Sequence, residues 1–553
     1  MLNSLQTACS SLWRKFVGLL KSDAPQSVAY DWFAEHEIAG LDANLGAGNC
    51  DKGALGSLRI DDATWRDLDV HTYLRRISAH GSLFARQLLY HRLRAGNEDT
   101  AFIAPLLAAL DDGHANTSAL LAATADTRHA LRSVSTDLTP TLFSGSQLVV
   151  GGWVRWLWIA PLVAMLGLLL PWSPLAAMSF VTPWLIGGYL VLNGWTQIRL
   201  NRALNRWHAQ RDAVTALLQS AIALGRAGAY TGHAVLLPLA QTLPQQQQLV
   251  AQLSPTWIEH TPMVAEYANL LAMHQYTRLA DDVARLQTHL ATLRTVYLQV
   301  AQAEAQICLL THLQRQSAAC AAQFSESTSE PPQLHVVAMI NPLLDNAQPL
   351  NMHLNGVGAL VTGQNGVGKS TWLRGVGLNL LAARAFGFCY AQSATVPRLP
   401  GWSSIDNEDS LATGDSLYMA EMRRAETLLR VADQHHGAVF LIDEIFKGTN
   451  NAESVAAAAA VPSHLAQKAL VIVSTHNTVL APLLQAQLEP LRLVKHENTL
   501  ALEPGILAQT NGLQMMQNYA FPDSVRHTAA QVHQWFSGYV AQPENYPNLL
   551  LKT

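Results

Sequence analysis

Gly363-Gln-Asn-Gly-Val-Gly-Lys369-Ser370 is the stretch that decides the fold of the C-terminal part of this 553-residue chain. An apolar run at residues 359–362 precedes it, and a helical pattern over residues 371–385 follows it. A glycine-rich loop between a buried strand and a helix is the context in which GxxxxGK[ST] binds nucleotide phosphates. The stretch therefore predicts an α/β P-loop domain that binds ATP.

Each part of this loop has a role in the predicted nucleotide site. Backbone N–H groups of the loop surround the phosphates, and the dipole of the following helix favours their negative charge. Lys369 reaches the β- and γ-phosphates, and the Ser370 hydroxyl binds Mg²⁺. The predicted ATP-binding residues are Gly363, Gln364, Asn365, Gly366, Val367, Gly368, Lys369, Ser370 and Thr371.

Two further strands are expected to end in polar residues. Val439-Phe-Leu-Ile-Asp443-Glu444 is an apolar run that ends in two acids, and Val471-Ile-Val-Ser-Thr-His476 ends in a histidine. We assign Asp443 to the Mg²⁺ shell and Glu444 to the activation of the attacking water as a general base. His476 would sense the γ-phosphate or orient that water. The predicted catalytic residues are therefore Glu444, His476 and Lys369.

The segment between these motifs permits two interpretations. It reads Leu411-Ala-Thr-Gly-Asp-Ser-Leu-Tyr-Met-Ala-Glu-Met422. A glycine-serine loop at the start of a helix can donate N–H and hydroxyl groups to a phosphate. The same residues can instead cap the helix, with Asp415 or Ser416 as the N-cap. The residues of the segment favour neither interpretation.

The pattern of the chain changes at residues 324–333, which form a short, polar, proline-containing linker. Beyond it, strands alternate with helices. Short continuous apolar runs, such as residues 438–442 and 469–474, are typical of a buried parallel sheet. We therefore expect an α/β domain over residues 331–553.

Residues 156–198 contain no Asp, Glu, Lys, Arg or His. A helix that crosses a bilayer core needs about 20 apolar residues. We predict two transmembrane helices, residues 153–170 and 175–195, joined by Pro171-Trp-Ser-Pro174 and kinked by internal prolines. Arginines flank the pair and the turn has none, so both ends face the cytoplasm from the inner or cytoplasmic membrane. The competing interpretation is a helical hairpin buried in a soluble core.

Helical patterns surround this hairpin. Residues 60–147 are a predicted helical core, and residues 199–330 a helical lever with one long amphipathic pattern at residues 262–323. Residues 1–59 begin with a basic amphipathic stretch, which fits a helix on a membrane surface or a helix packed on the protein. The predicted fold is thus an α/β P-loop ATPase domain preceded by an all-α core and lever, which a transmembrane hairpin at residues 148–198 interrupts.

Composition excludes several classes of protein. Charged residues make up 14% of the chain and hydrophobic residues 49%, which excludes a disordered chain. The net charge of −4 argues against a strongly basic nucleic-acid binder. The five cysteines are scattered without CxxC spacing, which indicates a reducing compartment: Cys9, Cys50, Cys308, Cys320 and Cys389.

The order of these motifs resembles that of the MutS DNA mismatch repair ATPase family. The similar segments are Thr362-Gly-Gln-Asn-Gly-Val-Gly-Lys-Ser-Thr371, Leu411 to Met422, Asp443-Glu-Ile-Phe-Lys-Gly-Thr449, Ser474-Thr-His476, Asn341-Pro342, Asn511-Gly-Leu513 and Phe521-Pro522. A weaker similarity to the helical core of the family covers Ala79-His-Gly-Ser-Leu-Phe-Ala-Arg-Gln-Leu-Leu89.

The resemblance implies a homodimer with composite ATP sites. ATP binding would close the two ATPase domains, hydrolysis would release them, and the lever would transmit the motion. Ser416 would then contact the γ-phosphate in trans, at the partner subunit's nucleotide, which favours the phosphate-binding interpretation of its segment. The resemblance also implies DNA as a partner, and a protein near the membrane is the other partner that we consider.

The chain departs from the family pattern at several places. Phe446-Lys447 stands where the family usually has Gly-Arg, and Asp415 where a basic residue is common. Phe33-Ala34-Glu35 is similar to the family's mismatch-reading Phe-x-Glu, but no mismatch-recognition domain surrounds it. The predicted hairpin lies where the family's DNA clamp would branch from the lever. ATPase chemistry is therefore expected, whereas mismatch repair itself is in doubt.

Two other functions compete with a membrane-anchored MutS-like ATPase. An ABC-type membrane ATPase has a similar phosphate loop and a histidine after the last strand, but the chain lacks an LSGGQ-like segment before Asp443. A nucleotide-sensing scaffold without catalysis would not need Lys369, Glu444 and His476 together.

Overall fold

The computed structural model describes residues 59–96, 99–113, 116–143, 152–173, 176–253, 261–325, 332–405, 417–444, 446–447, 451–496, 499–507 and 521–540. Several predictions lie outside these residues: those for the N-terminal segment with Phe33-Ala34-Glu35, for Ser416, and for Asn511-Gly-Leu513.

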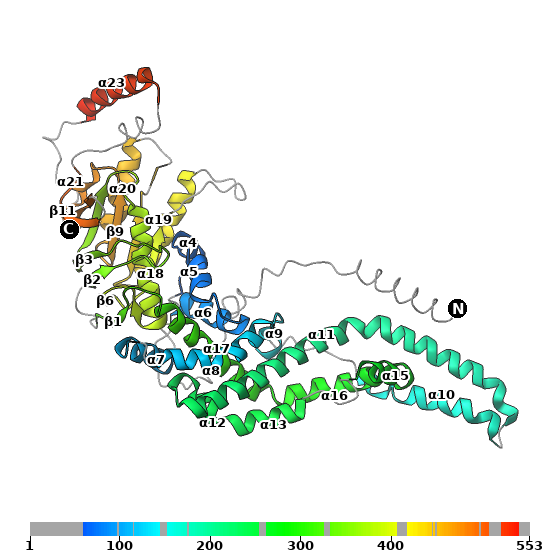
Figure 1. The fold of residues 1–553 in the computed structure, drawn as a ribbon. Helices are drawn as coiled ribbons and strands as arrows, with labels where there is room; N and C mark the ends of the chain where they lie inside the picture. The colour runs from blue at the N-terminus through cyan, green and yellow to red at the C-terminus, as the bar shows by residue number, and fades with distance from the viewer. Residues whose placement is uncertain are drawn as a thin grey trace.

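The molecule is elongated (Figure 1). Two sheets and their helices form one end, a bundle of helices lies beside them, and a helical arm projects from the bundle away from the sheets. The expected order of a helical N-terminal region followed by an α/β domain is therefore confirmed.

The larger sheet has six strands in the order β11-β10-β4-β9-β8-β7. The five strands from β10 to β7 are parallel, and β11 pairs antiparallel with β10 at the edge. The strands are β4 (Gly358–Gly363), β7 (Gly401–Ser404), β8 (Val439–Asp443), β9 (Leu470–Thr475), β10 (Leu488–His496) and β11 (Thr499–Pro504). The parallel sheet expected from the continuous apolar runs is thus present, and every residue of β4, β8 and β9 is buried.

Helices cover both faces of this sheet. Residues that alternate along β8 belong to two different hydrophobic clusters, because successive side chains of a strand point to opposite faces. One face packs on α18 (Lys369–Phe386), and the other packs on α19 (Leu417–Gln434), α20 (Asn451–Leu465) and α21 (Leu480–Leu484). A further helix, α23 (Asp523–Val540), lies beyond the sheet in Figure 1.

A second sheet of five strands has the order β3-β2-β6-β1-β5. Its strands are β1 (Cys320–Phe324), β2 (Gln333–Met339), β3 (Leu350–Asn355), β5 (Phe388–Cys389) and β6 (Ser393–Val396). The first of these strands precedes the expected linker, yet it pairs with β5 and β6. Residues from before the expected domain boundary therefore belong to this sheet.

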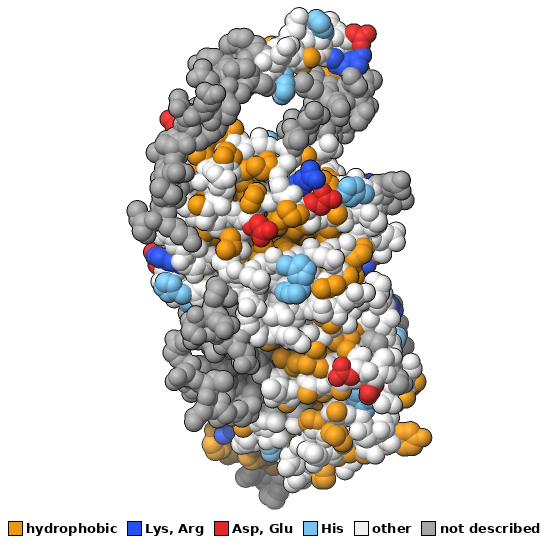
Figure 2. Space-filling model, turned by 90° about the vertical axis from the view of Figure 1, so that its left-hand side faces the viewer, with side chains coloured by type: hydrophobic (Ala, Val, Ile, Leu, Met, Phe, Trp, Pro, Cys, Tyr) orange, Lys and Arg blue, Asp and Glu red, His pale blue; other side chains and the backbone are white. Residues whose placement is uncertain are grey.

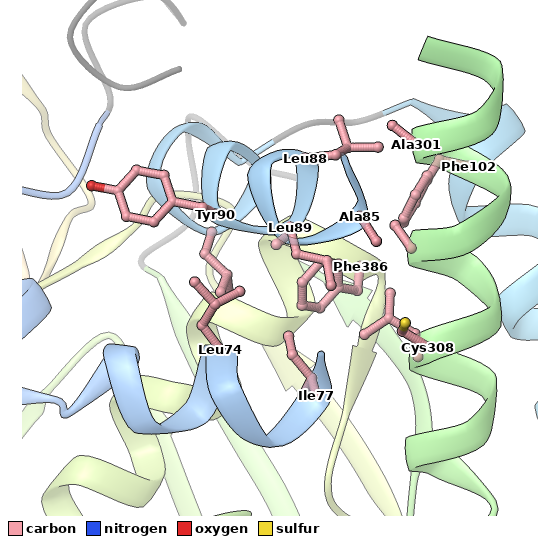
Figure 3. Close-up of a cluster of buried hydrophobic side chains, with 14 of the residues drawn as sticks. Leu74, Ile77, Ala85, Leu88, Leu89, Tyr90, Phe102, Ala301, Cys308 and Phe386 are labelled. Carbon is pink, nitrogen blue, oxygen red and sulfur yellow. The ribbon is translucent and has the colours of Figure 1, made fainter. Parts of the chain in front are cut away.

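The helical bundle and the α/β domain share one hydrophobic core. Figure 3 shows Leu88 of α6 (Leu83–Ala95) beside Ala301 of a long helix, α17 (Leu290–Leu313), and Ile77 of α5 (Val70–Ile77) near Phe386 at the end of α18. The other bundle helices are α4 (Asp62–Asp67), α7 (Thr100–Asp111), α8 (Thr117–Arg132), α9 (Thr139–Leu142), η4 (Ala234–Leu236), α12 (Leu237–Gln241) and α13 (Leu243–Leu253). The helix that follows the P-loop, α18, therefore packs directly on the bundle.

The long pattern expected at residues 262–323 is not one helix. It divides into α15 (Pro262–Ala272), α16 (His274–Thr288) and α17, and its last four residues are part of β1. The first break lies at Met273, which has a left-handed backbone with φ of 50°, and the second at His289. Amphipathic spacing persists across both breaks, so the sequence pattern does not show where one helix ends and the next begins.

The arm contains the residues of the predicted hairpin. It begins with η1 (Gly152–Trp156) and α10 (Ile159–Leu169), continues through η2 (Leu170–Trp172) and η3 (Ala176–Val181), and returns along α11 (Thr182–Thr231). Close packing joins the two sides, since the Thr182 hydroxyl donates to the Gly167 carbonyl at 2.8 Å. In Figure 1, α10 and the first part of α11 lie side by side.

Two details of the hairpin differ from the prediction. Pro161 and Pro183 lie in the first turns of α10 and α11, where the N–H groups have no helical partner, so they do not interrupt a helix. The second expected span, residues 175–195, is not a helix of its own. It consists of the 3₁₀ helix η3 and the start of α11. Helix α11 is 50 residues long and continues past Trp195 to Thr231.

Among the residues that the structure describes, one helical stretch is long and apolar enough to cross a membrane. It is Trp153–Trp172, with a mean hydropathy of 1.8, and only 17% of its window is buried. Most of its side chains therefore lie outside the hydrophobic core of the described residues, with Val154 and Leu157 as exceptions. Large apolar side chains remain exposed along the arm, including Trp156 at 67%, Trp172 at 82% and Trp184 at 80%.

Low charge is not confined to the arm. Figure 2 shows the side of the molecule that carries the sheets, where few charged side chains lie scattered among hydrophobic ones.

Candidate nucleotide site

The predicted phosphate loop connects β4 to α18 at the carboxyl end of the sheet. The helix begins at Lys369, two residues earlier than expected, with Gly368 as its N-cap. Gly368 has φ of 102°, a backbone conformation that side-chain-bearing residues rarely adopt, and an added Cβ there would meet open space. Glycine is thus required at this position by the backbone rather than by crowding.

Lys369 folds back over the loop. Its Nζ donates to the carbonyl of Gly363 at 2.8 Å and to that of Gln364 at 3.2 Å. Desolvation lowers the pKa of Lys369, and the nearby carboxylates of Glu444 and Asp443 oppose that shift. The ammonium group therefore lies inside the loop and close to both acids, with only weak neutral acceptors bound to it.

Asn341 fixes the first turn of this helix. Its Nδ2 donates to the carbonyl of Thr371 at 2.8 Å, and its Oδ1 accepts from the N–H of Leu343 at 2.9 Å. This contact explains physically why an asparagine precedes the loop in the sequence pattern.

Asp443 and Ser370 belong to the same side of the sheet. In β8, Leu441 and Asp443 alternate with Ile442, and Leu441 packs on the side of α18. Asp443 is 7% exposed and pairs in register with Ser474 of β9. The buried Ser474 hydroxyl has no hydrogen-bond partner among the described residues. Buried polar groups of this kind are rare in folded proteins.

Glu444 lies beyond the end of β8 and is held by two side chains. His476 Nδ1 hydrogen-bonds to Oε1 of Glu444, and Lys447 Nζ lies 2.8 Å from Oε2. The backbone N–H of Glu444 donates to the Ser474 carbonyl at 2.9 Å. The structure thus brings Glu444 and His476, which follow the neighbouring strands β8 and β9, into direct contact.

The hydrogen bond from His476 is the largest cause of a lowered pKa at Glu444. Burial opposes this shift, the hydrogen bond from Lys447 adds to it, and the resulting pKa is about 2. Glu444 is therefore fully ionised at neutral pH, and both its oxygens are already paired.

Lys447 connects this pair to a buried acid on α19. The Lys447 backbone N–H donates to Oε1 of Glu421 at 3.1 Å, and Glu421 is 2% exposed. One hydrogen bond thus joins α19 to the backbone of the residue that pairs with Glu444.

The structure describes most of the residues that the sequence analysis assigned to this site. Lys369, Asp443, Glu444 and His476 lie at one edge of the sheet, while Ser416 lies outside the described residues. The sequence analysis assigned no role to Glu421, Ser474 or Lys447. Of these, only Lys447 carried a signal, as part of the departure Phe446-Lys447.

The residues of the site are suited to bind Mg²⁺ and a nucleoside triphosphate. The Ser370 hydroxyl and the Asp443 carboxylate are oxygen ligands of the kind that Mg²⁺ prefers. The unpartnered Ser474 hydroxyl beside Asp443 leaves a buried donor for a ligand or its water shell. The glycine loop and Lys369 supply donors for phosphate oxygens.

Comparison with known proteins identifies this domain. The sequence profile of MutS domain V matches residues 359–537. By this match, residues 359–537 belong to the MutS family. The matched region contains the P-loop, both acids and His476.

Similar curated proteins agree with this assignment. The DNA mismatch repair protein MutS of Treponema pallidum (strain Nichols) is 30% identical over 183 residues, which is 32% of this chain and 20% of that protein. The corresponding protein of Thermus aquaticus is 31% identical over 174 residues, or 30% and 21% of the two chains. DNA mismatch repair protein MutS 2 of Haloarcula marismortui is 32% identical over 178 residues, or 30% and 19%. The chain thus spans about a fifth of the length of these MutS relatives.

Proposed function

We propose that this MutS-family chain is a membrane-anchored ATPase that binds and hydrolyses ATP with Mg²⁺. The observation that carries the proposal is that Lys369, Asp443, Glu444 and His476 lie together at the carboxyl end of the parallel strands, with Glu444 hydrogen-bonded to His476.

Each residue has a defined part in the proposed hydrolysis. Lys369 exchanges the carbonyls of Gly363 and Gln364 for phosphate oxygens, which are stronger acceptors because they are charged. Ser370 and Asp443 would hold Mg²⁺, which would supply positive charge next to the phosphates. Glu444 accepts a hydrogen bond from the attacking water and orients it toward the γ-phosphate.

Glu444 must first be released. Its two oxygens are occupied by His476 and Lys447, and with a pKa of about 2 it is a weak base. Loss of the Lys447 contact would free one oxygen for water and raise the pKa of Glu444. The arrangement seen here is therefore a resting state in our proposal, and the contact from Glu421 to Lys447 is the path by which α19 would end it.

We propose that closure of a homodimer moves α19 and so ends the contact of Lys447 with Glu444. In this proposal Ser416, which lies just before α19, contacts the partner subunit's nucleotide. The MutS relatives are named for DNA mismatch repair, and duplex DNA is the macromolecule on which we propose that the dimer acts.

The arm is the proposed membrane anchor. The supporting observations are the length and hydropathy of Trp153–Trp172, the exposure of its side chains and the uncharged start of α11. The anchor lies in the cytoplasmic membrane with the ATPase domain on the cytoplasmic side.

Glu444→Gln is the decisive variant. We expect it to bind ATP, to lose hydrolysis and to accumulate dimer, because an amide keeps the shape but cannot accept a proton. Glu503→Gln is the matched control, since Glu503 on the edge strand β11 is also held by a histidine and a cation, His496 and Arg492 of β10. Unchanged turnover in Glu444→Gln, measured as phosphate release with Mg-ATP, would refute the catalytic assignment.

Two further measurements separate the other parts of the proposal. Duplex DNA binding measured at several salt concentrations should show a steep loss of affinity with salt, because phosphate contacts release counterions. Absence of DNA binding would leave the ATPase proposal intact and exclude DNA as partner. Membrane anchoring fails if the full-length chain is found in the soluble fraction without detergent.

A further inference from the structure

Helix α15 carries an apolar stripe that the described protein leaves uncovered. Met263, Tyr267 and Leu271 follow one another at intervals of four and therefore lie along one face of the helix. They are 68%, 59% and 67% exposed. Three large neighbouring apolar side chains on one face need a partner, because scattered single exposures are normal but a contiguous stripe is not.

This helix lies where the uncharged part of the arm begins. It packs on α16, and α16 packs on η1, where Arg155 Nε is 3.3 Å from Asp281 Oδ1. Arg155 is the last charged residue before the uncharged stretch. Helix α15 is therefore connected, through α16, to the charged end of the candidate span.

Aromatic and basic side chains mark the same level of the arm. The rings of Trp153 and Trp195 are 5.7 Å apart, and the guanidinium of Arg199 lies 5.0 Å from the centre of the Trp195 ring. Tryptophan and arginine together at the end of an apolar helix are typical of a membrane–water interface. The proposed boundary of the bilayer therefore passes close to α15.

The orientation of α15 fits this boundary. Figure 1 shows α15 end-on beside the start of α10, whereas α10 and α11 are seen lengthwise. Its axis thus runs across the axes of the arm helices. A helix in that orientation at the end of a membrane span lies in the plane of the interface.

We propose that α15 is an interfacial helix whose stripe of Met263, Tyr267 and Leu271 is covered by bilayer lipid. Such helices insert about 5–10 Å into the boundary between headgroups and acyl chains. Tyr267 suits this layer because its ring is apolar and its hydroxyl reaches water. The stripe continues the exposed apolar surface of the arm, and this continuity favours lipid over a protein partner. The inference rests on the proposed membrane anchoring and adds a second, independent contact that fixes the depth and tilt of the arm.

The test uses a fluorescent amino acid introduced by amber suppression into the full-length chain in phosphatidylcholine–phosphatidylglycerol vesicles. The probe replaces Tyr267, Leu166 in the middle of α10, or Gln247, an exposed residue of α13. Quenching is measured with iodide in water and with lipids that carry a spin label at a shallow or a deep position.

We expect the probe at 267 to lose fluorescence with the shallow lipid quencher, the probe at 166 with the deep one, and the probe at 247 with iodide alone. Quenching at 267 by iodide alone, with deep quenching at 166 retained, would overturn the role of α15 and leave the anchor intact. Loss of lipid quenching at 166 would refute the anchor itself. A probe at 267 that is shielded from both quenchers only at high protein-to-lipid ratio would assign the stripe to a second copy of the chain and overturn the proposal.

Discussion

Asp67 joins the helical bundle to the sheet, and its replacement by alanine should be among the most costly single changes in the chain. It is the last residue of α4 and is 4% exposed. Its Oδ2 accepts from the Ser403 hydroxyl at 2.8 Å and from the N–H of Ile405 at 2.9 Å. Ser403 lies in β7 and Ile405 directly follows it, and the segment that contains Ser416 begins just after Ile405.

The magnitude follows from the donors that would be left without a partner. A buried donor that loses its acceptor costs about 1–3 kcal/mol, and hydrogen bonds to a charged group are at the upper end of that range. Two such donors make the loss of stability in Asp67→Ala about 3–5 kcal/mol after allowance for non-additivity. Asp67→Asn keeps the shape and one acceptor oxygen, so we expect about 1–3 kcal/mol.

Asp62→Ala is the matched control on the same helix. The Asp62 carboxylate is 86% exposed and pairs with Arg94 at 2.6 Å, and exposed ion pairs contribute about 0–1 kcal/mol. The assay is pulse proteolysis in a urea series on the detergent-solubilised chain. If Asp67→Ala proved no more destabilising than Asp62→Ala, the assignment of Asp67 as the link between bundle and sheet would be wrong.

Three other predictions concern the site and its support. Lys369→Met should weaken ATP binding about 10- to 100-fold, because hydrogen bonds to a charged donor contribute about 1.5–3 kcal/mol; titration with a fluorescent ATP analogue measures this. Gly377→Val should lower stability by about 1–3 kcal/mol, since an added Cβ would lie 2.5 Å from Leu68 and 3.0 Å from Leu441, and a urea series that shows no loss would contradict it. Glu444 has a pKa lowered from 4.5 to about 2, so its pairing stabilises the fold above pH 4.5 and that contribution disappears as pH falls from 4.5 to 2. Solvent screening limits this pH-dependent change in stability to about 1 kcal/mol. The change should be smaller in His476→Ala than in Lys447→Met, because His476 is the larger cause of the lowered pKa of Glu444.

The nucleotide-binding end of the sheet could be predicted from the sequence because its motifs are local. The glycine spacing, the apolar runs of β8 and β9, and the polar residues that end them are each contained in a few consecutive residues. Parallel strands then bring their carboxyl ends together without further information. The start of α18 was missed by two residues because its N-cap is Gly368, which has no capping side chain.

The remaining differences arise from tertiary contacts that spacing does not encode. Met273 is left-handed without being glycine, so no propensity indicated that the lever would break there. The strand β1 lies before the linker but pairs with β5 and β6, a long-range choice that its own five residues do not reveal. The contact of Lys447 with Glu444 likewise depends on how the chain turns after β8.

That turn explains why the departure Phe446-Lys447 is compatible with the ATPase site. Glu444 and Phe446 have φ of 50° and 62°, which costs a residue other than glycine about 1–2 kcal/mol. Phe446 is completely buried, with its ring 6.2 Å from that of Tyr418, and full burial of a phenylalanine contributes about 1.5–3 kcal/mol. The burial of the Phe446 ring therefore offsets the backbone strain at this position. A glycine there would have neither the strain nor the buried ring. Lys447 Nζ also lies 2.8 Å from Glu444 Oε2, so the lysine that differs from the family pattern contacts the proposed catalytic acid rather than displacing it.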